Sequence, residues 1–180
     1  MLPATYYNAY KTPTEPIEPS FPRWVYFDMD GTIADLYNVP GWLEGLKASN
    51  TSPYLLANPI GDSRQLTSLF KRLKKQGYHL GIVSWGAKGG SAEYTRAVKR
   101  AKIAWLNAHY PKVFEEIHVV KHGTPKKSVV RNKHSYLVDD ESRNLAQWGH
   151  RSINASDYRN MIVGLTALIK LAAPNRNEVF

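Results

Sequence analysis

The chain has 180 residues, 43% of them hydrophobic, so it is long enough for one buried core and too short for two comfortable domains. Its 24 Lys and Arg against 15 Asp and Glu give a formal net charge of +9, which favours anionic partners such as phosphate esters, nucleotides and polynucleotides. The absence of Cys excludes disulfides, thiolate metal sites and cysteine nucleophiles, and fits a cytoplasmic location. No signal peptide and no run of about 18 apolar residues is found, so we expect a soluble protein without membrane contact.

The first 22 residues differ in composition from the rest of the chain. Residues 1–22 contain five prolines among Tyr, Thr and Glu. Proline fixes φ and lacks a backbone donor, so we predict an extended Pro-rich leader. We favour a tail that lies loosely on the surface, with a docking arm for a partner as the alternative. Residues 23–180 are expected to form a single domain.

Four short apolar runs have the composition of strands that are covered on both faces. They are Trp24–Phe27 before Asp28, Tyr78–Val83 before Ser84, Ile117–Val120 before Lys121, and Ser135–Val138 before Asp139 and Asp140. Each predicted strand therefore ends at polar residues.

Helical patterns separate these runs. Asp62 or Ser63 can cap a helix that ends before Gly77, and its basic last turn complements the helix dipole. Ser91 can cap a second helix, and a last one is expected over 157–171. Strands that alternate with helices predict an α/β fold with a mainly parallel sheet flanked by helices. In such sheets ligands bind beyond the carboxyl ends of the strands, where the four polar clusters lie.

Residues 36–61 are the hardest segment to interpret, because prolines and glycines interrupt them. Only a short helix near Trp42–Lys47 is expected there. We interpret the segment as a small cap or flap over the site, inserted after the first strand.

Asp28 and Asp30 lie just after a predicted strand, and Gly31 allows the chain to turn so that both carboxylates can face one ligand. In the hydrolysis of a phosphate ester, the two carboxylates of such a pair can have different roles. An ionised carboxylate can attack phosphorus, and a protonated neighbour can donate to the departing oxygen and then activate water. Asp28 suits the first role and Asp30 the second.

Asp139 and Asp140 can help to form a Mg²⁺ site, since a hard cation needs several oxygen ligands. Adjacent side chains on an extended segment point apart, so we expect one of the two to bind the ion directly and the other through water or a hydrogen bond. Which of them binds directly stays open.

The non-bridging oxygens of a phosphate need donors and positive charge. Ser84 and the backbone N–H groups of Trp85 and Gly86 can form a small anion-binding nest. Lys126 or Lys127 can supply a fixed cation.

Residues 28–35, Asp-Met-Asp-Gly-Thr-Ile-Ala-Asp, resemble the first motif of the haloacid dehalogenase (HAD) superfamily of phosphatases. Ser84 after an apolar strand resembles the second motif and Lys126 the third-motif lysine. Asp139 and Asp140 resemble the fourth-motif acidic pair. The motifs follow one another in the order of the family.

This resemblance implies a Rossmann-like sheet and an aspartyl-phosphate on Asp28, with Asp30 as the acid/base. It implies Mg²⁺ bound by Asp28, by the main-chain carbonyl of Asp30 and by Asp139 or Asp140. It favours Lys126 over Lys127. The implied phosphate-binding residues are Thr32, Ser84, Trp85 and Lys126. Because Asp30 is present, the sequence resembles the phosphatase branches and departs from the dehalogenases.

The run from Val120 to Lys126 and the short insertion are similar to small bacterial and phage-type hydrolases related to 5′(3′)-deoxyribonucleotidases. This implies a nucleoside monophosphate as substrate. Tyr37, Trp42 and Trp85 can stack on a base, with packing as the alternative role. His122 lies near the expected phosphate lysine.

Two other functions stay open. A polynucleotide end phosphatase would use the +9 charge in contacts with the phosphate backbone. A catalytically silent module that binds nucleic acid or protein would keep the fold without turnover. The intact acidic set favours an enzyme.

Overall fold

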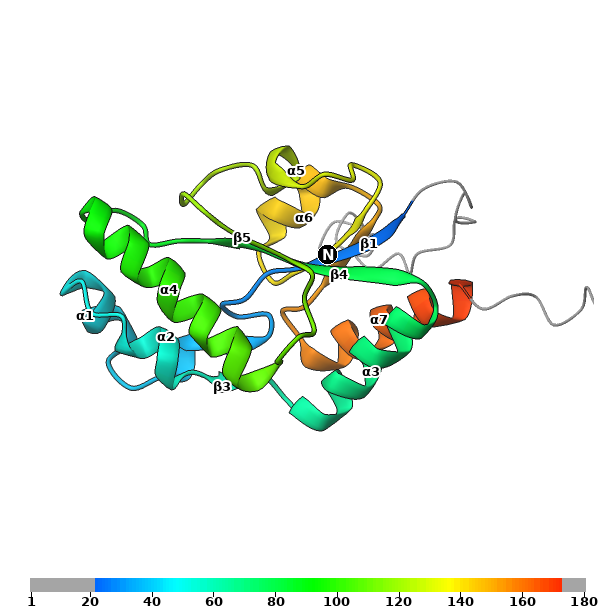
Figure 1. Cartoon of the computed structure of the whole chain (residues 1–180), viewed down its shortest axis with the longest axis horizontal. Helices are drawn as coiled ribbons and strands as arrows, with labels where there is room; N and C mark the ends of the chain where they lie inside the picture. Colours follow the sequence, from blue (N-terminus) through cyan, green and yellow to red (C-terminus); the bar gives the residue numbers. More distant parts are fainter. Residues whose placement is uncertain (1–21, 173–180) are drawn as a thin grey trace, which may run out of the picture.

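The computed structural model describes residues 22–172, so the predicted leader, apart from Pro22, lies outside the described residues. A five-stranded sheet in the order β5-β4-β1-β6-β7 forms the centre of the molecule (Figure 1). Its strands are β1 (Arg23–Phe27), β4 (Tyr78–Trp85), β5 (Glu116–Val120), β6 (Tyr136–Asp139) and β7 (Ser152–Asn154). Every neighbouring pair is parallel. The predicted α/β, Rossmann-like fold is thereby confirmed.

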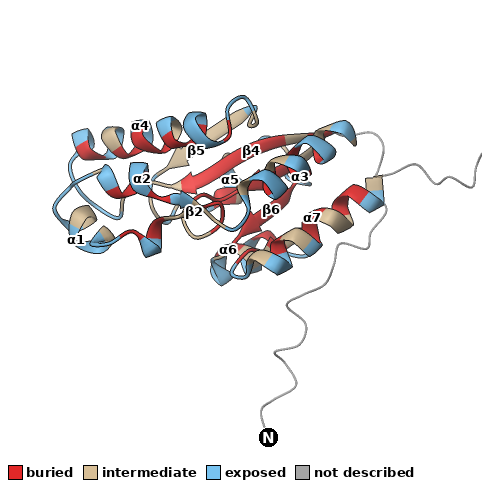
Figure 2. Ribbon diagram, turned by 90° about the horizontal axis from the view of Figure 1, so that it is seen from below, coloured by how far each residue is buried: buried red, intermediate tan, exposed pale blue. Residues whose placement is uncertain are grey.

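Helices cover both faces of this sheet (Figure 1). One face carries α3 (Ser63–Lys75), α4 (Ala92–His109) and α7 (Tyr158–Ala172), and the other α5 (Lys126–Val129) and α6 (Ser142–Trp148). Side chains alternate along β1, so Val25 and Phe27 pack into the first layer and Tyr26 into the second. Figure 2 shows the central strands buried and the helices exposed on their outer sides. No helix within 22–172 is both long and apolar enough to cross a bilayer.

Two of the three predicted long helices, α3 and α4, begin at predicted capping residues. The Asp62 carboxylate accepts hydrogen bonds from the N–H groups of Arg64 and Gln65 at 2.8 and 3.2 Å. The Ser91 hydroxyl accepts one from the N–H of Tyr94 at 3.1 Å. These bonds satisfy backbone donors that the first turn of a helix otherwise leaves unpaired.

The insertion after β1 folds against the domain at the carboxyl edge of the sheet. Its elements are β2 (Ala34–Asp35), the 3₁₀ helix η2 (Leu36–Asn38), α1 (Trp42–Lys47), α2 (Ser52–Leu56) and β3 (Asn58–Pro59). β2 and β3 pair antiparallel and close the base of the insertion. Tyr54 of α2 packs on Tyr94 and Val98 of α4, and Figure 1 shows α2 beside α4.

Candidate active site

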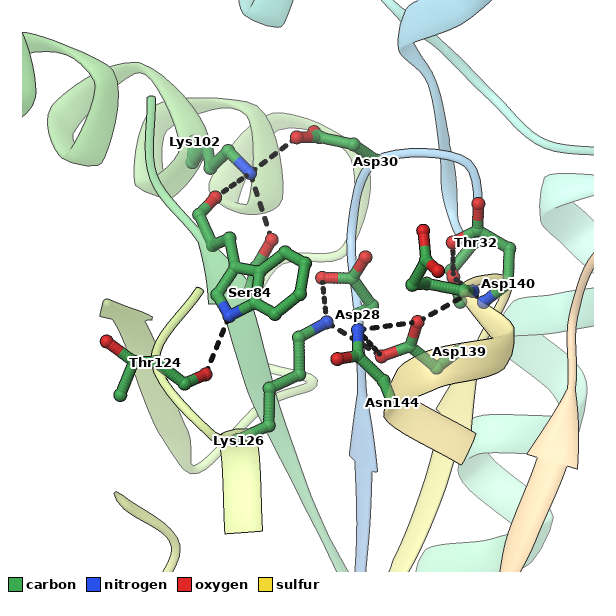
Figure 3. Close-up of polar contacts among 12 residues, drawn as sticks. Asp28, Asp30, Thr32, Ser84, Lys102, Thr124, Lys126, Asp139, Asp140 and Asn144 are labelled. Atoms are coloured by element: carbon green, nitrogen blue, oxygen red, sulfur yellow. Dashed lines mark hydrogen bonds and ion pairs between the residues drawn. The ribbon is translucent and has the colours of Figure 1, made fainter. Parts of the chain in front are cut away.

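Three strand ends bring the predicted site residues together at one edge of the sheet (Figure 3). Asp28 follows β1, Ser84 lies near the end of β4, and Asp139 is the last residue of β6. β1 lies between β4 and β6, and the N–H of Asp28 donates to the carbonyl of Val138 at 2.9 Å. The parallel register thus places side by side residues that are far apart in the sequence.

Lys126 joins two of the carboxylates. Its Nζ lies 2.8 Å from Oδ1 of Asp28 and 2.7 Å from Oδ2 of Asp139, and its side chain is buried. Burial alone would raise the pKa of Asp28, but the neighbouring ammonium groups, Lys126 first, outweigh it and hold that pKa below its usual value. Asp28 is therefore ionised, as a nucleophile must be. Lys127 donates instead to the carbonyl of Trp148 at 3.0 Å, so the structure brings Lys126 and not Lys127 to the site.

Asp28, Asp139 and Asp140 form a carboxylate cluster in which one oxygen of each lies within 4.8 Å of the others. Burial, and then the charge of Asp28, raises the pKa of Asp139 to about 6 and that of Asp140 to about 7. A divalent cation would relieve this repulsion. Asp139 and Asp140 do not diverge as expected, because β6 ends at Asp139 and the chain bends at Asp140. Both can therefore reach one ion.

Asn144 of α6 adjoins the cluster and was not predicted from the sequence. Its Nδ2 donates to both oxygens of Asp139, at 3.2 and 3.1 Å. Its buried Oδ1 meets no hydrogen-bond donor within residues 22–172. A buried amide oxygen that accepts no hydrogen bond and lies beside three carboxylates is typical of a site that holds Mg²⁺ or a water bound to Mg²⁺.

Gly31 makes the turn that follows Asp30, with φ at +78°. A Cβ at this position would collide with Oδ2 of Asp140 and would come within 2.7 Å of Cε2 of Tyr37. Glycine is therefore required both for the left-handed backbone and for the close approach of Asp140.

Thr32 is oriented toward Asp140. Its hydroxyl donates to Oδ1 of Asp140 at 2.9 Å and accepts from the N–H of Asp140 at 3.1 Å. Thr32 is fully buried and does not line the cavity above the site. The structure thus places this expected phosphate-binding residue behind the carboxylate cluster, where it positions Asp140.

A second buried lysine, Lys102 of α4, lies beside Asp30 (Figure 3). Its Nζ donates to Oδ2 of Asp30 at 2.7 Å, to Oγ of Ser84 at 2.9 Å and to the carbonyl oxygen of Trp85 at 2.7 Å. All three protons of the ammonium group are used in this way. Lys102 therefore links the expected acid/base to the expected phosphate-binding serine.

Lys102 was missed in the sequence, although a signal was available. It lies one helical turn after Val98 and nearly one before Trp105, within the apolar stripe of α4. A lysine on a buried stripe needs a charged or polar partner. The charged partner of Lys102 is Asp30, and Ser84 and the carbonyl of Trp85 are its polar partners.

Asp28 and Asp30 occupy different environments. Figure 3 shows Asp30 directed toward Lys102, on the other side of Asp28 from Asp139 and Asp140. Burial raises the pKa of Asp30 above its usual value, although the Lys102 ammonium acts in the opposite direction. The pKa values of Asp28 and Asp30 are thus shifted in opposite directions, as a nucleophile and a general acid require.

The expected anion-binding nest is formed only in part. The N–H of Gly86 donates to the carbonyl of Val120 at 2.7 Å, so the prediction that it faces a phosphate is wrong. Gly86 continues the pairing of β4 with β5 by one residue and so uses a donor that the sequence suggested was free. The side chain of Trp85 is held separately, since its indole N–H donates to the carbonyl of Thr124 at 2.8 Å. The Ser84 hydroxyl remains at the floor of the cavity.

A cavity of about 590 Å³ opens over the site. Its floor includes Asp28, Asp30, Ser84 and Asp140. The aromatic residues singled out in the sequence all line it, namely Tyr37, Trp42 and Trp85, and so does His122. The rings of Tyr37 and Trp42 meet edge to face at 5.1 Å, and Tyr37 is 49% exposed. The cavity has the size and the mixed apolar and polar lining of a small-ligand site.

No protein-family model matches the chain, and no curated protein matches its sequence. The fold and the site define the class: an α/β protein with a largely buried carboxylate cluster and two buried lysines at the carboxyl edge of a parallel sheet.

Proposed function

We propose that this protein is a Mg²⁺-dependent hydrolase of phosphate monoesters in which Asp28 is the nucleophile. The observation that carries the proposal is the pair of carboxylates in opposite environments, with Asp28 ionised beside Lys126 and Asp30 bound to Lys102. Nucleophilic displacement with help from a general acid needs this division. The resemblance of residues 28–35 to the first motif of HAD phosphatases supports the same chemistry.

The reaction has two steps. In the first, an oxygen of Asp28 attacks phosphorus, the bond from phosphorus to the ester oxygen breaks, and Asp30 gives its proton to that oxygen. In the second, water attacks the phosphorus of the aspartyl-phosphate, and Asp30 takes the proton that the water loses. Phosphate leaves, and Asp28 regains its carboxylate. Lys126 and Ser84 are the candidates for binding the non-bridging oxygens.

The residues that would hold Mg²⁺ are Asp28, Asp139 and Asp140, with the main-chain carbonyl of Asp30 and the amide oxygen of Asn144 as further donors. When bound, the ion neutralises part of the charge that a phosphate brings to the carboxylates.

Mg²⁺ binding should be measurable without turnover. When Mg²⁺ exceeds its Kd about 100-fold, we expect the melting temperature to rise by roughly 5–10 °C, because the ion binds only the folded cluster. The Asp140→Asn variant should lose most of this rise, while Glu93→Gln, an exposed control on α4, should keep it. Scanning calorimetry with Mg²⁺ and with chelator measures both. An equal rise in wild type and Asp140→Asn would exclude Asp140 as a ligand.

A nucleoside monophosphate is the substrate that we favour. Tyr37 and Trp42 offer aromatic surface for a base on the wall of the cavity, above the carboxylates. The net charge of +9 favours the rival substrate, the phosphorylated end of a polynucleotide.

Phosphate release over a panel of metabolites, nucleotides and end-phosphorylated oligonucleotides tests the proposal. The panel is run with Mg²⁺ and with chelator, and at two salt concentrations. Mg²⁺-dependent release from a nucleoside monophosphate supports the leading substrate, and stronger, salt-sensitive release from oligonucleotides supports the rival. Absence of release from every ester, by a folded protein supplied with Mg²⁺, contradicts the proposed activity.

A further inference from the structure

Three basic residues near the mouth of the cavity have no role in the two steps above. Lys88 follows β4, His122 lies after β5, and Arg143 belongs to the first turn of α6. Lys88 and His122 line the cavity, and Lys88 and Arg143 are exposed. We refer to these three residues as the basic rim.

The ring of Trp85 connects the basic rim to the carboxylates. Cζ of Arg143 lies 5.0 Å from the ring centroid of Trp85, and Nζ of Lys126 lies 5.2 Å from it. The ring of His122 meets that of Trp85 at 4.8 Å. The Arg143 guanidinium and the lysine that contacts Asp28 therefore share one indole ring as a neighbour.

The charges of the rim are not neutralised within the part of the chain that the structure describes. No carboxylate between residues 22 and 172 forms an ion pair with Lys88 or Arg143, although exposed Glu141 also lines the cavity. Burial, and then the positive charges of Lys88 and Arg143, hold the pKa of His122 below its usual value. An anion at the rim would relieve this repulsion.

We propose that Lys88, His122 and Arg143 form a second phosphate subsite, so that the substrate carries a second phosphate besides the one that is hydrolysed. This inference rests on the proposed function, which places the first phosphate at Asp28. A nucleoside with phosphates at both ends of its sugar, or a nucleotide whose next group is a phosphodiester, has the required chemistry. Cations already lie against the ring of Trp85, which leaves Tyr37 and Trp42 as the base-binding side of the cavity.

The test compares kcat/KM for a nucleoside 5′-monophosphate, the 3′,5′-bisphosphate of the same nucleoside and a 5′-phosphorylated dinucleotide. We expect one or both of the esters that carry a second phosphate to be preferred by roughly tenfold, and the preference to shrink as salt rises, because the rim is exposed. Preference for the bisphosphate identifies a phosphomonoester as the second group, and preference for the dinucleotide identifies a phosphodiester.

Two double variants assign this preference to the rim. Lys88→Ala/Arg143→Ala should abolish it. Lys71→Ala/Arg72→Ala removes the same residue types from the exposed end of α3 and should leave it intact. Equal kcat/KM for all three esters in the wild type, or the same loss in both double variants, would overturn the subsite.

A binding measurement separates failure of the subsite from failure of the proposed activity. Calorimetry on the Asp28→Asn background, without turnover, should give tighter binding of the bisphosphate than of the monophosphate, and the difference should vanish in the Lys88→Ala/Arg143→Ala background. If no ester is hydrolysed but this difference is present, the proposed activity fails and the subsite stands. If turnover is present and binding shows no difference, the subsite fails alone.

Discussion

Asp28→Asn is expected to lower kcat/KM for phosphate release by about 10⁴-fold or more, because an amide cannot serve as the nucleophile. The substitution keeps the shape of a side chain that is only 11% exposed, and Lys126 keeps its contact with Asp139. We therefore expect a folded protein. Steady-state kinetics with saturating Mg²⁺ measure the loss, and circular dichroism checks the fold.

Asp35→Asn is the matched control for this experiment. Asp35 belongs to the same motif-like run, but its carboxylate accepts from Asn38 at 3.0 Å and does not line the cavity. Its turnover should stay within about twofold of the wild type, as is usual for surface substitutions away from a site. Turnover by purified Asp28→Asn at the level of Asp35→Asn would eliminate Asp28 as the nucleophile.

Lys102→Met should reduce both stability and activity. Met fills the space of the lysine stem, but it leaves Asp30 without its cation. Because 82% of the Asp30 side chain is buried, we expect the free energy of unfolding to fall by about 3 kcal/mol. Turnover should fall about 100-fold, because Asp30 and Ser84 both lose the group that positions them. Urea denaturation and kinetics measure the two effects.

Two further variants test whether these losses come from the ion pair between Lys102 and Asp30. Lys99→Met changes an exposed lysine of the same helix and should leave stability and turnover near the wild-type values. Lys102→Met/Asp30→Asn removes both members of the ion pair, so its stability should return to within about 1 kcal/mol of the wild type while it stays inactive. If Lys102→Met behaved like Lys99→Met, the ion pair with Asp30 would have no role.

The sheet and the long helices could be predicted because their signals are local. Apolar runs mark β1 and β4, and capping residues mark the starts of α3 and α4. The elements α5, α6 and β7 were not predicted, since each is too short to show a helical or strand period. In β7, for example, only Ile153 is buried.

The site could be predicted where its residues lie at strand ends, as Asp28, Ser84 and Asp139 do. Lys126 of α5 was singled out only through the family resemblance, whereas Lys102 of α4 and Asn144 of α6 were missed. Their direction depends on how α4 and α6 pack, which the sequence does not reveal locally. Packing also decides which donors the sheet uses, and for this reason the N–H of Gly86 was assigned wrongly to the phosphate nest.

Two buried lysines explain how several acids can lie close together at one edge of the sheet. Lys126 compensates Asp28 and Asp139, and Lys102 compensates Asp30. Unpaired charges in this position would cost more than the fold can supply. Lys126 and Lys102 hold the pKa of Asp28 below its usual value, whereas burial raises the pKa of Asp30 in spite of Lys102, and this difference is the basis of the proposed mechanism.

The most direct test of the mechanism is to trap the aspartyl-phosphate. Enzyme mixed with Mg²⁺ and substrate is quenched in acid during turnover and treated with borohydride, which reduces an acyl phosphate to the alcohol, and the peptides are sequenced by mass spectrometry. We expect homoserine at position 28, only when substrate is present. Steady release of phosphate with unmodified Asp28, or with homoserine at position 30, would exclude Asp28 as the nucleophile.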